Sequence, residues 1–257
     1  EQGESEKAEE VYLRSIKVNE EHPFAHGNLA AIYKSQKRWV EAARYGERSL
    51  ALALIRGKAN PLQWRFRKEI GTPEKIMTAR YDSQVAANLI RRELTEIYSR
   101  AGIHKKVIEH AEVLLRLDPQ DREVRDRLFT ALLETGKIDE AERLAREDLK
   151  RTPQATEPLL KLSLVSQARR DLPEAIGYVR QVLDKEPDNV SALRTLALLT
   201  FEQGKYEESL RLLREALQRK GNEAVLRSIL GTLRYRHGET TAALSDLQEA
   251  ARLNPND

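Results

Sequence analysis

From residue 88 onward, apolar residues recur with helical spacing, and the whole pattern repeats every 34 residues without slipping. One position of the repeat is leucine in all five copies, another is glycine with a single exception, and two more hold proline or a small residue. These positions are Leu94, Leu128, Leu162, Leu196 and Leu230; Gly102, Gly136, Arg170, Gly204 and Gly238; Pro119, Pro153, Pro187, Gly221 and Pro255; and Ala141, Ala175, Ser209 and Ala243. A period of this length indicates a stack of identical supersecondary units.

The copy at residues 190–223 shows what one unit contains. Apolar residues at helical spacing lead up to Gly204, where a residue without Cβ most easily adopts a tight or left-handed turn, and the helical spacing then resumes. Small residues such as Ala197 and Ser209 allow the two helices to approach closely. Neither helix can bury its apolar stripe alone, so neighbouring units must stack to make a core. The sequence therefore predicts an all-α fold of antiparallel helix pairs.

This pattern resembles the tetratricopeptide repeat (TPR), a family with a set order of large apolar, small and aromatic residues on two helices, followed by proline. The matching residues are Leu29, Ala30, Tyr33, Ala42, Ser49 and Leu50; Leu162, Ser163, Ala175, Val182 and Pro187; and Leu193, Leu196, Ala197, Tyr206, Ser209, Leu213 and Ala216. The helix endings at 117–119 and 253–255 are also typical of the family. The resemblance implies a right-handed superhelical solenoid, and the repeat boundaries look bacterial.

The resemblance also divides the chain into segments. Residues 1–22 are expected to hold the second helix of a truncated repeat. A complete unit follows, then a stretch that breaks the pattern, and then five consecutive units, at 23–56, 57–87, 88–121, 122–155, 156–189, 190–223 and 224–257. Neither end carries the polar outer face of a terminal repeat, so we expect one continuous solenoid that is part of a longer protein.

Residues 57–87 hold neither the leucine nor the alanine pattern, and two interpretations stay open: a degenerate repeat or an inserted helical hairpin. In both we expect helices packed at the junction between the 23–56 and 88–121 units. The segment is basic, and Arg65, Arg67 and Lys68 are a possible cationic patch for an acidic partner surface. The alternative is a repeat that drifted and buries its aromatic residues.

Composition narrows the function classes. Charged residues make up 33% of the chain and nearly balance, with a net charge of +3 that is not clustered, so we expect no nucleic acid partner. There is no cysteine for a disulfide or a thiolate site, and no apolar run long enough to span a membrane. These features leave the compartment open between cytoplasm and periplasm.

The sequence carries no recognisable catalytic chemistry. It has no phosphate-binding glycine loop, no nucleophile elbow and no pair of metal ligands with an acidic helper. His22 and His26 are four residues apart, but Pro23 at a helix start lies between them, so we interpret them as repeat-boundary residues. We therefore predict a chain that is not an enzyme, without metal or cofactor.

In the TPR family the first helices of the pairs line a concave groove that holds an extended peptide or a partner helix. Carried over position by position, the resemblance assigns groove residues to three consecutive units: Leu160, Lys161, Leu164, Arg194, Leu198, Phe201, Tyr235 and Arg236. An exposed apolar patch edged by cations is a candidate binding surface. The alternative is that Leu164 and Leu198 simply pack between adjacent first helices.

The function that these observations favour is a non-catalytic protein-protein interaction scaffold, part of a larger protein or assembly, which binds a peptide or partner protein in the groove. Two rivals stay open: a regulatory or substrate-docking arm of a multidomain enzyme, and a periplasmic assembly factor for pili or exported polysaccharide. A third, an RNA-binding solenoid, is disfavoured because the groove positions show no repeated polar code. Some family members clamp a chaperone's C-terminal carboxylate with an Asn on the first helix. The corresponding positions of this chain hold no Asn, so we do not expect it to bind a chaperone tail in this way. They are Ala31, Glu96, Thr130, Leu164, Leu198 and Thr232.

Overall fold

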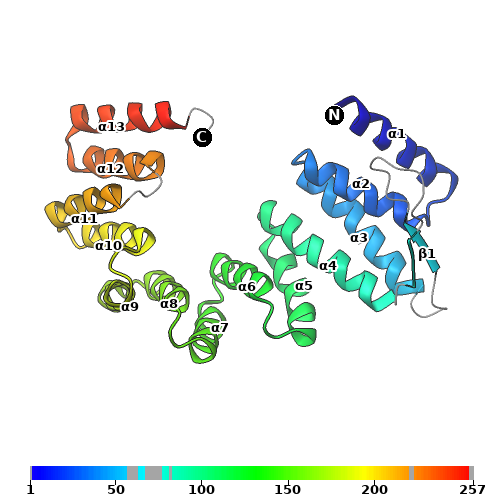
Figure 1. Cartoon of the computed structure of the whole chain (residues 1–257), viewed down its shortest axis with the longest axis horizontal. Coiled ribbons are helices and arrows are strands. Elements are labelled where there is room, and N and C mark those ends of the chain that lie inside the picture. The colour runs from blue at the N-terminus through cyan, green and yellow to red at the C-terminus, as the bar shows by residue number, and fades with distance from the viewer. Residues whose placement is uncertain (1, 57–62, 67–76, 81–82, 220–222, 255–257) are drawn as a thin grey trace. The chain divides into compact units, whose positions relative to one another are not determined.

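The structure is a computed structural model that describes residues 2–56, 63–66, 77–80, 83–219 and 223–254 (Figure 1). Its helices are α1 (Gln2–Val18), α2 (Pro23–Ser35), α3 (Trp39–Arg56), α4 (Ser83–Arg100), α5 (His104–Leu117), α6 (Arg122–Glu134), α7 (Ile138–Arg151), α8 (Glu157–Ala168), α9 (Leu172–Lys185), α10 (Val190–Glu202), α11 (Tyr206–Gln218), α12 (Glu223–His237) and α13 (Thr240–Leu253). Successive helices from α1 to α6, and again from α7 to α13, pack against each other, so the predicted all-α class is confirmed.

The helices group into two compact units. Unit 1 is Glu1–Gly136 and holds α1 to α6, whereas unit 2 is Lys137–Asp257 and holds α7 to α13. The boundary divides the predicted 122–155 repeat between its two helices. The right-handed superhelix concerns the path of the whole stack and stays a prediction.

Short polar side chains fix several helix starts. Asp121, Asp171 and Asn189 precede α6, α9 and α10, and each accepts a hydrogen bond from the backbone N–H three residues later, at 2.9 to 3.1 Å. His22 does the same for α2 through Nδ1, 3.2 Å from the Ala25 N–H, so it acts as a helix cap. These caps satisfy backbone donors that the first helical turn leaves free.

The turn inside each pair uses the left-handed backbone region. Gly102, Gly136, Gly204 and Gly238 have φ between 69° and 94°, and Lys37 and Arg170 take the same turn with φ of 59° and 62°. Residues with a Cβ adopt this conformation at a cost. Arg170 therefore replaces glycine in the repeat pattern but keeps the same turn.

Small and leucine positions build the core of unit 2. Leu162, Leu196 and Leu230 are buried, as are Ala197 and Ser209. The Ser209 hydroxyl donates a 2.6 Å hydrogen bond to the Ala197 carbonyl, which requires α10 and α11 to lie in direct contact. The predicted close approach of the two helices at these small residues is thus observed.

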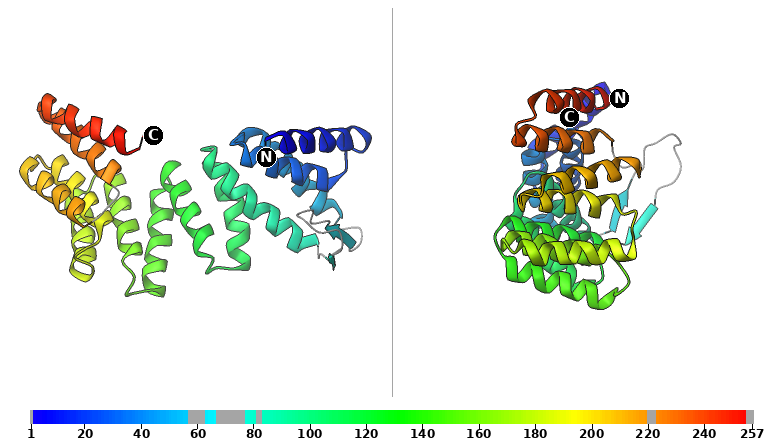
Figure 2. Two further views of the ribbon diagram at one scale, coloured as in Figure 1. Left: turned by 45° about the horizontal axis from the view of Figure 1, so that its top comes forward. Right: turned by 90° about the vertical axis from the view of Figure 1, so that its left-hand side faces the viewer.

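The prediction of helices in residues 57–87 is wrong for residues 63–66 and 77–80, whereas residues 83–87 belong to the start of α4. Two strands, β1 (Gln63–Phe66) and β2 (Met77–Arg80), pair antiparallel, with Gln63 opposite Arg80 and Phe66 opposite Met77 (Figure 2). The sequence of β1 alternates polar and aromatic residues, a period-two pattern that favours a strand over a helix. Arg65 lies in β1, but the structure does not describe its side chain. Arg67 and Lys68 lie outside the described residues, so the cationic patch stays a prediction.

Candidate functional site

The first helices of the unit 2 pairs, α8, α10 and α12, present apolar side chains to solvent. Leu164 and Leu198 are 45% and 36% exposed, and Tyr235 is 65% exposed. This exposure disagrees with the alternative in which both leucines pack between adjacent helices. The surface, called the unit 2 face below, consists of Leu160, Leu164, Arg194, Leu198, Phe201, Tyr235 and Arg236.

An aromatic cluster anchors one end of the unit 2 face. The Arg236 guanidinium lies over the ring of Phe201, 4.9 Å from its centroid, and thereby joins α12 to α10. Phe201 in turn meets Tyr206 edge to face at 6.1 Å, and Tyr206 stacks on His237 with centroids 3.5 Å apart. Such contacts hold Phe201 half-buried and in place, whereas Tyr235 projects freely.

Two arginines of the unit 2 face lack an acidic partner. Arg194 and Arg236 form no ion pair with any residue of the part of the chain that the structure describes. Arg236 is exposed and Arg194 is half-buried. Both guanidinium groups therefore keep donors for a carboxylate brought by another molecule.

Lys161 does not belong to this surface, in contrast to its predicted place among the groove residues. It is buried, with 9% of its surface exposed, and its Nζ lies 3.0 Å from the Asp148 Oδ2 of α7. A buried ammonium requires such a partner, because an unpaired charge inside a protein is costly. The sequence shows Asp148 in a position that is usually small, but its pairing depends on contact between different helix pairs.

The corresponding face of unit 1 is charged and internally paired. Lys34 of α2 reaches two carboxylates of α4, with its Nζ 2.7 Å from Glu93 and 2.6 Å from Glu96. Arg92 of α4 binds Asp121, the N-cap of α6, and lies 3.6 Å from Glu123. Lys34 and Arg92 are thus both paired with acids at the start of, or on, the next first helix.

A second polar cluster of unit 1 joins residues of α3, α4 and α5. Tyr98 donates a 2.7 Å hydrogen bond to Glu47 Oε1, and the buried His110 has its Nε2 3.2 Å from that oxygen. The hydrogen bonds from His110 and from Tyr98 lower the pKa of Glu47 to about 2. Burial, and then the bond to this carboxylate, raise the pKa of Tyr98.

Sequence reasoning missed this cluster, although a signal existed. Tyr98 and His110 stack with centroids 5.7 Å apart, and the equivalent Tyr33 and Tyr45 stack at 5.4 Å in the preceding pair. Both stacks join residues twelve apart in the sequence, on the two helices of one pair. Their glutamate partners come from the preceding helix pair, so spacing within one repeat cannot identify them.

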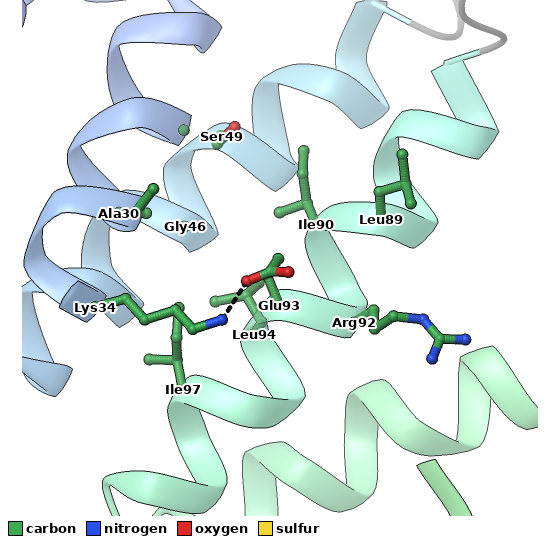
Figure 3. Close-up of a pocket in the computed structure, with 12 residues that line it drawn as sticks. Ala30, Lys34, Gly46, Ser49, Leu89, Ile90, Arg92, Glu93, Leu94 and Ile97 are labelled. Atoms are coloured by element: carbon green, nitrogen blue, oxygen red, sulfur yellow. Dashed lines mark hydrogen bonds and ion pairs between the residues drawn. The ribbon is translucent and has the colours of Figure 1, made fainter. Parts of the chain in front are cut away.

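A pocket of about 240 Å³ opens among α2, α3 and α4 in unit 1 (Figure 3). Most of its lining is glycine, alanine, leucine or isoleucine, and the described residues include no cluster of three or more metal-ligating side chains. Among the same residues, no helix is both long and apolar enough to cross a membrane.

Comparisons with known proteins agree with this architecture. Two models of the tetratricopeptide repeat match residues 25–59 and 160–225. A TPR repeat-containing protein of Methanocaldococcus jannaschii is 26% identical over 151 residues, which cover 54% of this chain and 27% of that protein. The chain thus spans about a quarter of the length of this relative.

Solved structures show the same fold. A tetratricopeptide repeat protein from Parabacteroides merdae has a TM-score of 0.70 and 15% identity over 100% of this chain and 89% of its own. A thermophilic TPR protein of Thermus thermophilus has a TM-score of 0.58 and 21% identity, covering 66% of this chain and 93% of its own. At these identities the likeness concerns the fold alone.

Proposed function

Because this chain is a tetratricopeptide repeat protein, we propose that it serves as a protein-interaction scaffold whose unit 2 face binds a peptide segment of a partner. The single observation that supports this is the combination of exposed Leu164, Leu198 and Tyr235 with two arginines that form no ion pair among the described residues. Apolar side chains that stay in water add little to the stability of the fold, whereas a bound partner could bury them.

The chemistry of the face defines the segment that fits it. Leu164 and Leu198 can bury an aliphatic or aromatic side chain, and Tyr235 adds an aromatic surface with a polar end. Arg194 and Arg236 can each receive a carboxylate, and arginine is among the residues that contribute most to binding at interfaces. The expected segment therefore carries apolar side chains beside aspartate or glutamate.

The test uses a displayed library of random peptides selected on the immobilised chain. Selected peptides should be enriched in leucine or aromatic residues next to acidic ones. A double variant, Leu198→Glu with Tyr235→Glu, changes two exposed residues and should leave the helical circular dichroism spectrum intact while selected peptides lose at least about tenfold in affinity.

The matched control is Leu117→Glu, because Leu117 is a 58% exposed leucine at the end of α5 and lies outside the unit 2 face. It should leave the affinity for the selected peptides unchanged. Equal binding by the folded double variant, or an equal loss in the control, would reject the unit 2 face as the binding surface.

A further inference from the structure

The pocket of unit 1 shares no residue with the unit 2 face. On one side, α2 and α3 contribute Gly27, Ala30, Ala31 and Gly46. The other side is the apolar surface of α4, with Leu89, Ile90, Leu94 and Ile97 (Figure 3). One wall is therefore almost without side chains, and the facing wall is lined with branched aliphatic ones.

The pocket exists because unit 1 has small residues where the other repeats have larger ones. In the five later repeats, the position of Ala31 holds Glu96, Thr130, Leu164, Leu198 and Thr232, and that of Gly27 holds Arg92, Asp126, Leu160, Arg194 and Ser228. The position of Gly46 holds Ala111, Ala145, Val179, Leu213 and Leu247. Only α2 and α3 thus have glycine or alanine at all three positions, and all three line the pocket. Gly46 lets Leu94 approach α3, because a Cβ there would lie 2.8 Å from the Leu94 Cδ2, whereas Gly27 and Ala31 leave room at the pocket.

The charges at its edge are already matched. Lys34 reaches from α2 toward Glu93 and, with Glu96, spans the gap between α2 and α4 (Figure 3). Arg92 points away from the pocket, toward its partners Asp121 and Glu123 (Figure 3). A charged group entering the pocket would find no unpaired counter-charge there, so the occupant that fits is uncharged and apolar.

We propose that this pocket binds one uncharged aromatic or branched aliphatic side chain of a partner peptide. An apolar cavity of about 150 Å³ is large enough for benzene, and the pocket offers about 240 Å³. One phenylalanine or leucine side chain therefore fits, in contact with Leu89 and Ile90. The pocket is a second anchoring point, and its occupancy does not depend on the unit 2 face.

The test follows the methyl NMR signals of Leu89, Ile90, Leu94 and Ile97 during titration of the full chain. The probes are capped pentapeptides, acetyl-Gly-Ser-Xaa-Ser-Gly-amide, in which Xaa is Phe, Leu, Ala or Asp. The Phe and Leu peptides should shift these methyl signals saturably, whereas the Ala and Asp peptides should bind at least about tenfold more weakly. Shifts that do not depend on Xaa, or that spread over the surface, would overturn the proposal.

Two substitutions on α2 give a matched pair. Ala31→Leu places a larger side chain at the pocket, and Asn28→Leu places the same side chain at an exposed position of the same helix that does not line it. The Ala31 variant should lose at least about tenfold in affinity for the Phe peptide, and the Asn28 variant should bind as wild type does.

A third variant guards against a folding artefact. Leu89→Ala removes part of the pocket wall at a residue that is 49% exposed, so the fold should persist while Phe peptide binding weakens. If the Ala31 and Leu89 variants both fold and both bind like wild type, the pocket is not the site. The Leu198→Glu with Tyr235→Glu variant should still bind the Phe peptide at the pocket, even where it no longer binds the library-selected peptides. This result would separate the pocket proposal from the proposed function.

Discussion

The first-helix faces of the two units share one repeat pattern, but equivalent cations on them differ in whether they are ion-paired within the chain. In unit 1, Lys34 and Arg92 each face two carboxylates of the chain itself. In unit 2, Arg194 and Arg236 have no such partner among the described residues. Arg92 and Arg194 occupy the same position of the repeat. A partner approaching Arg92 must replace existing ion pairs, whereas at Arg194 it forms a new one.

The comparison predicts that core and face residues of one helix differ sharply in their effect on stability. Leu162→Ala should lower the free energy of unfolding by about 2–5 kcal/mol, because Leu162 is 1% exposed and its loss leaves a cavity. Leu164→Ala, two residues later on α8, should cost under about 1 kcal/mol, because Leu164 is already 45% exposed. Urea unfolding of both variants measures the difference, and equal losses would show that Leu164 is a core residue.

A smaller effect is expected at the Glu47 cluster and depends on pH. The pKa of Glu47 is about 2 in the folded chain, below its ordinary value of about 4.3. Its contribution to stability is therefore present above about pH 4.3 and is lost as the pH falls toward about 2. Glu47→Gln should be less stable than wild type near pH 5, and the gap should narrow at about pH 3.

Urea midpoints of both proteins at the two pH values measure this effect. The matched control is Glu10→Gln, because Glu10 pairs with Arg14 on the exposed surface of α1. If the urea midpoints of wild type and the Glu47 variant differ by the same amount at both pH values, the Glu47 carboxylate titrates normally and the prediction is wrong.

The smallest effects concern the two faces themselves. Lys34→Met leaves Glu93 and Glu96 without the cation between them and should cost about 0.5–1 kcal/mol, less at high salt. Arg194→Met removes a cation without an acidic partner and should change stability by less than about 0.5 kcal/mol. Thermal melts at low and high salt would distinguish them, and an equal, salt-dependent loss in both would remove the contrast between the faces.

The repeated parts of the fold could be predicted because each residue has its counterpart one period away. Helix pairs, turns at Gly204 and contact between Ala197 and Ser209 all depend on interactions within about one repeat. The strands β1 and β2 could not be predicted from the repeat, because their segment interrupts the period and each strand has only four residues. The repeat position of Leu164 and Leu198 allowed both exposure and burial between adjacent first helices, and only the structure distinguishes the two.

The ionic contacts could not be predicted in the same way. The pairing of Lys161 with Asp148 and the Glu47 cluster join residues of different helix pairs, so their geometry depends on how successive pairs stack. The pocket depends on the coincidence of three small residues, Gly27, Ala31 and Gly46, around one space. Each is visible in the sequence, but only the fold shows that they face a common wall on α4.

The measurement that tests the account most directly is charge reversal on the unit 2 face. A library-selected acidic peptide is titrated against wild type, the Arg194→Glu with Arg236→Glu variant, and an Arg211→Glu with Arg214→Glu variant, which changes the net charge equally through exposed residues of α11. The account predicts at least about a tenfold loss for the first variant alone, and a gain when the peptide's acids become lysines. Equal losses in both variants, or none in either, would contradict it.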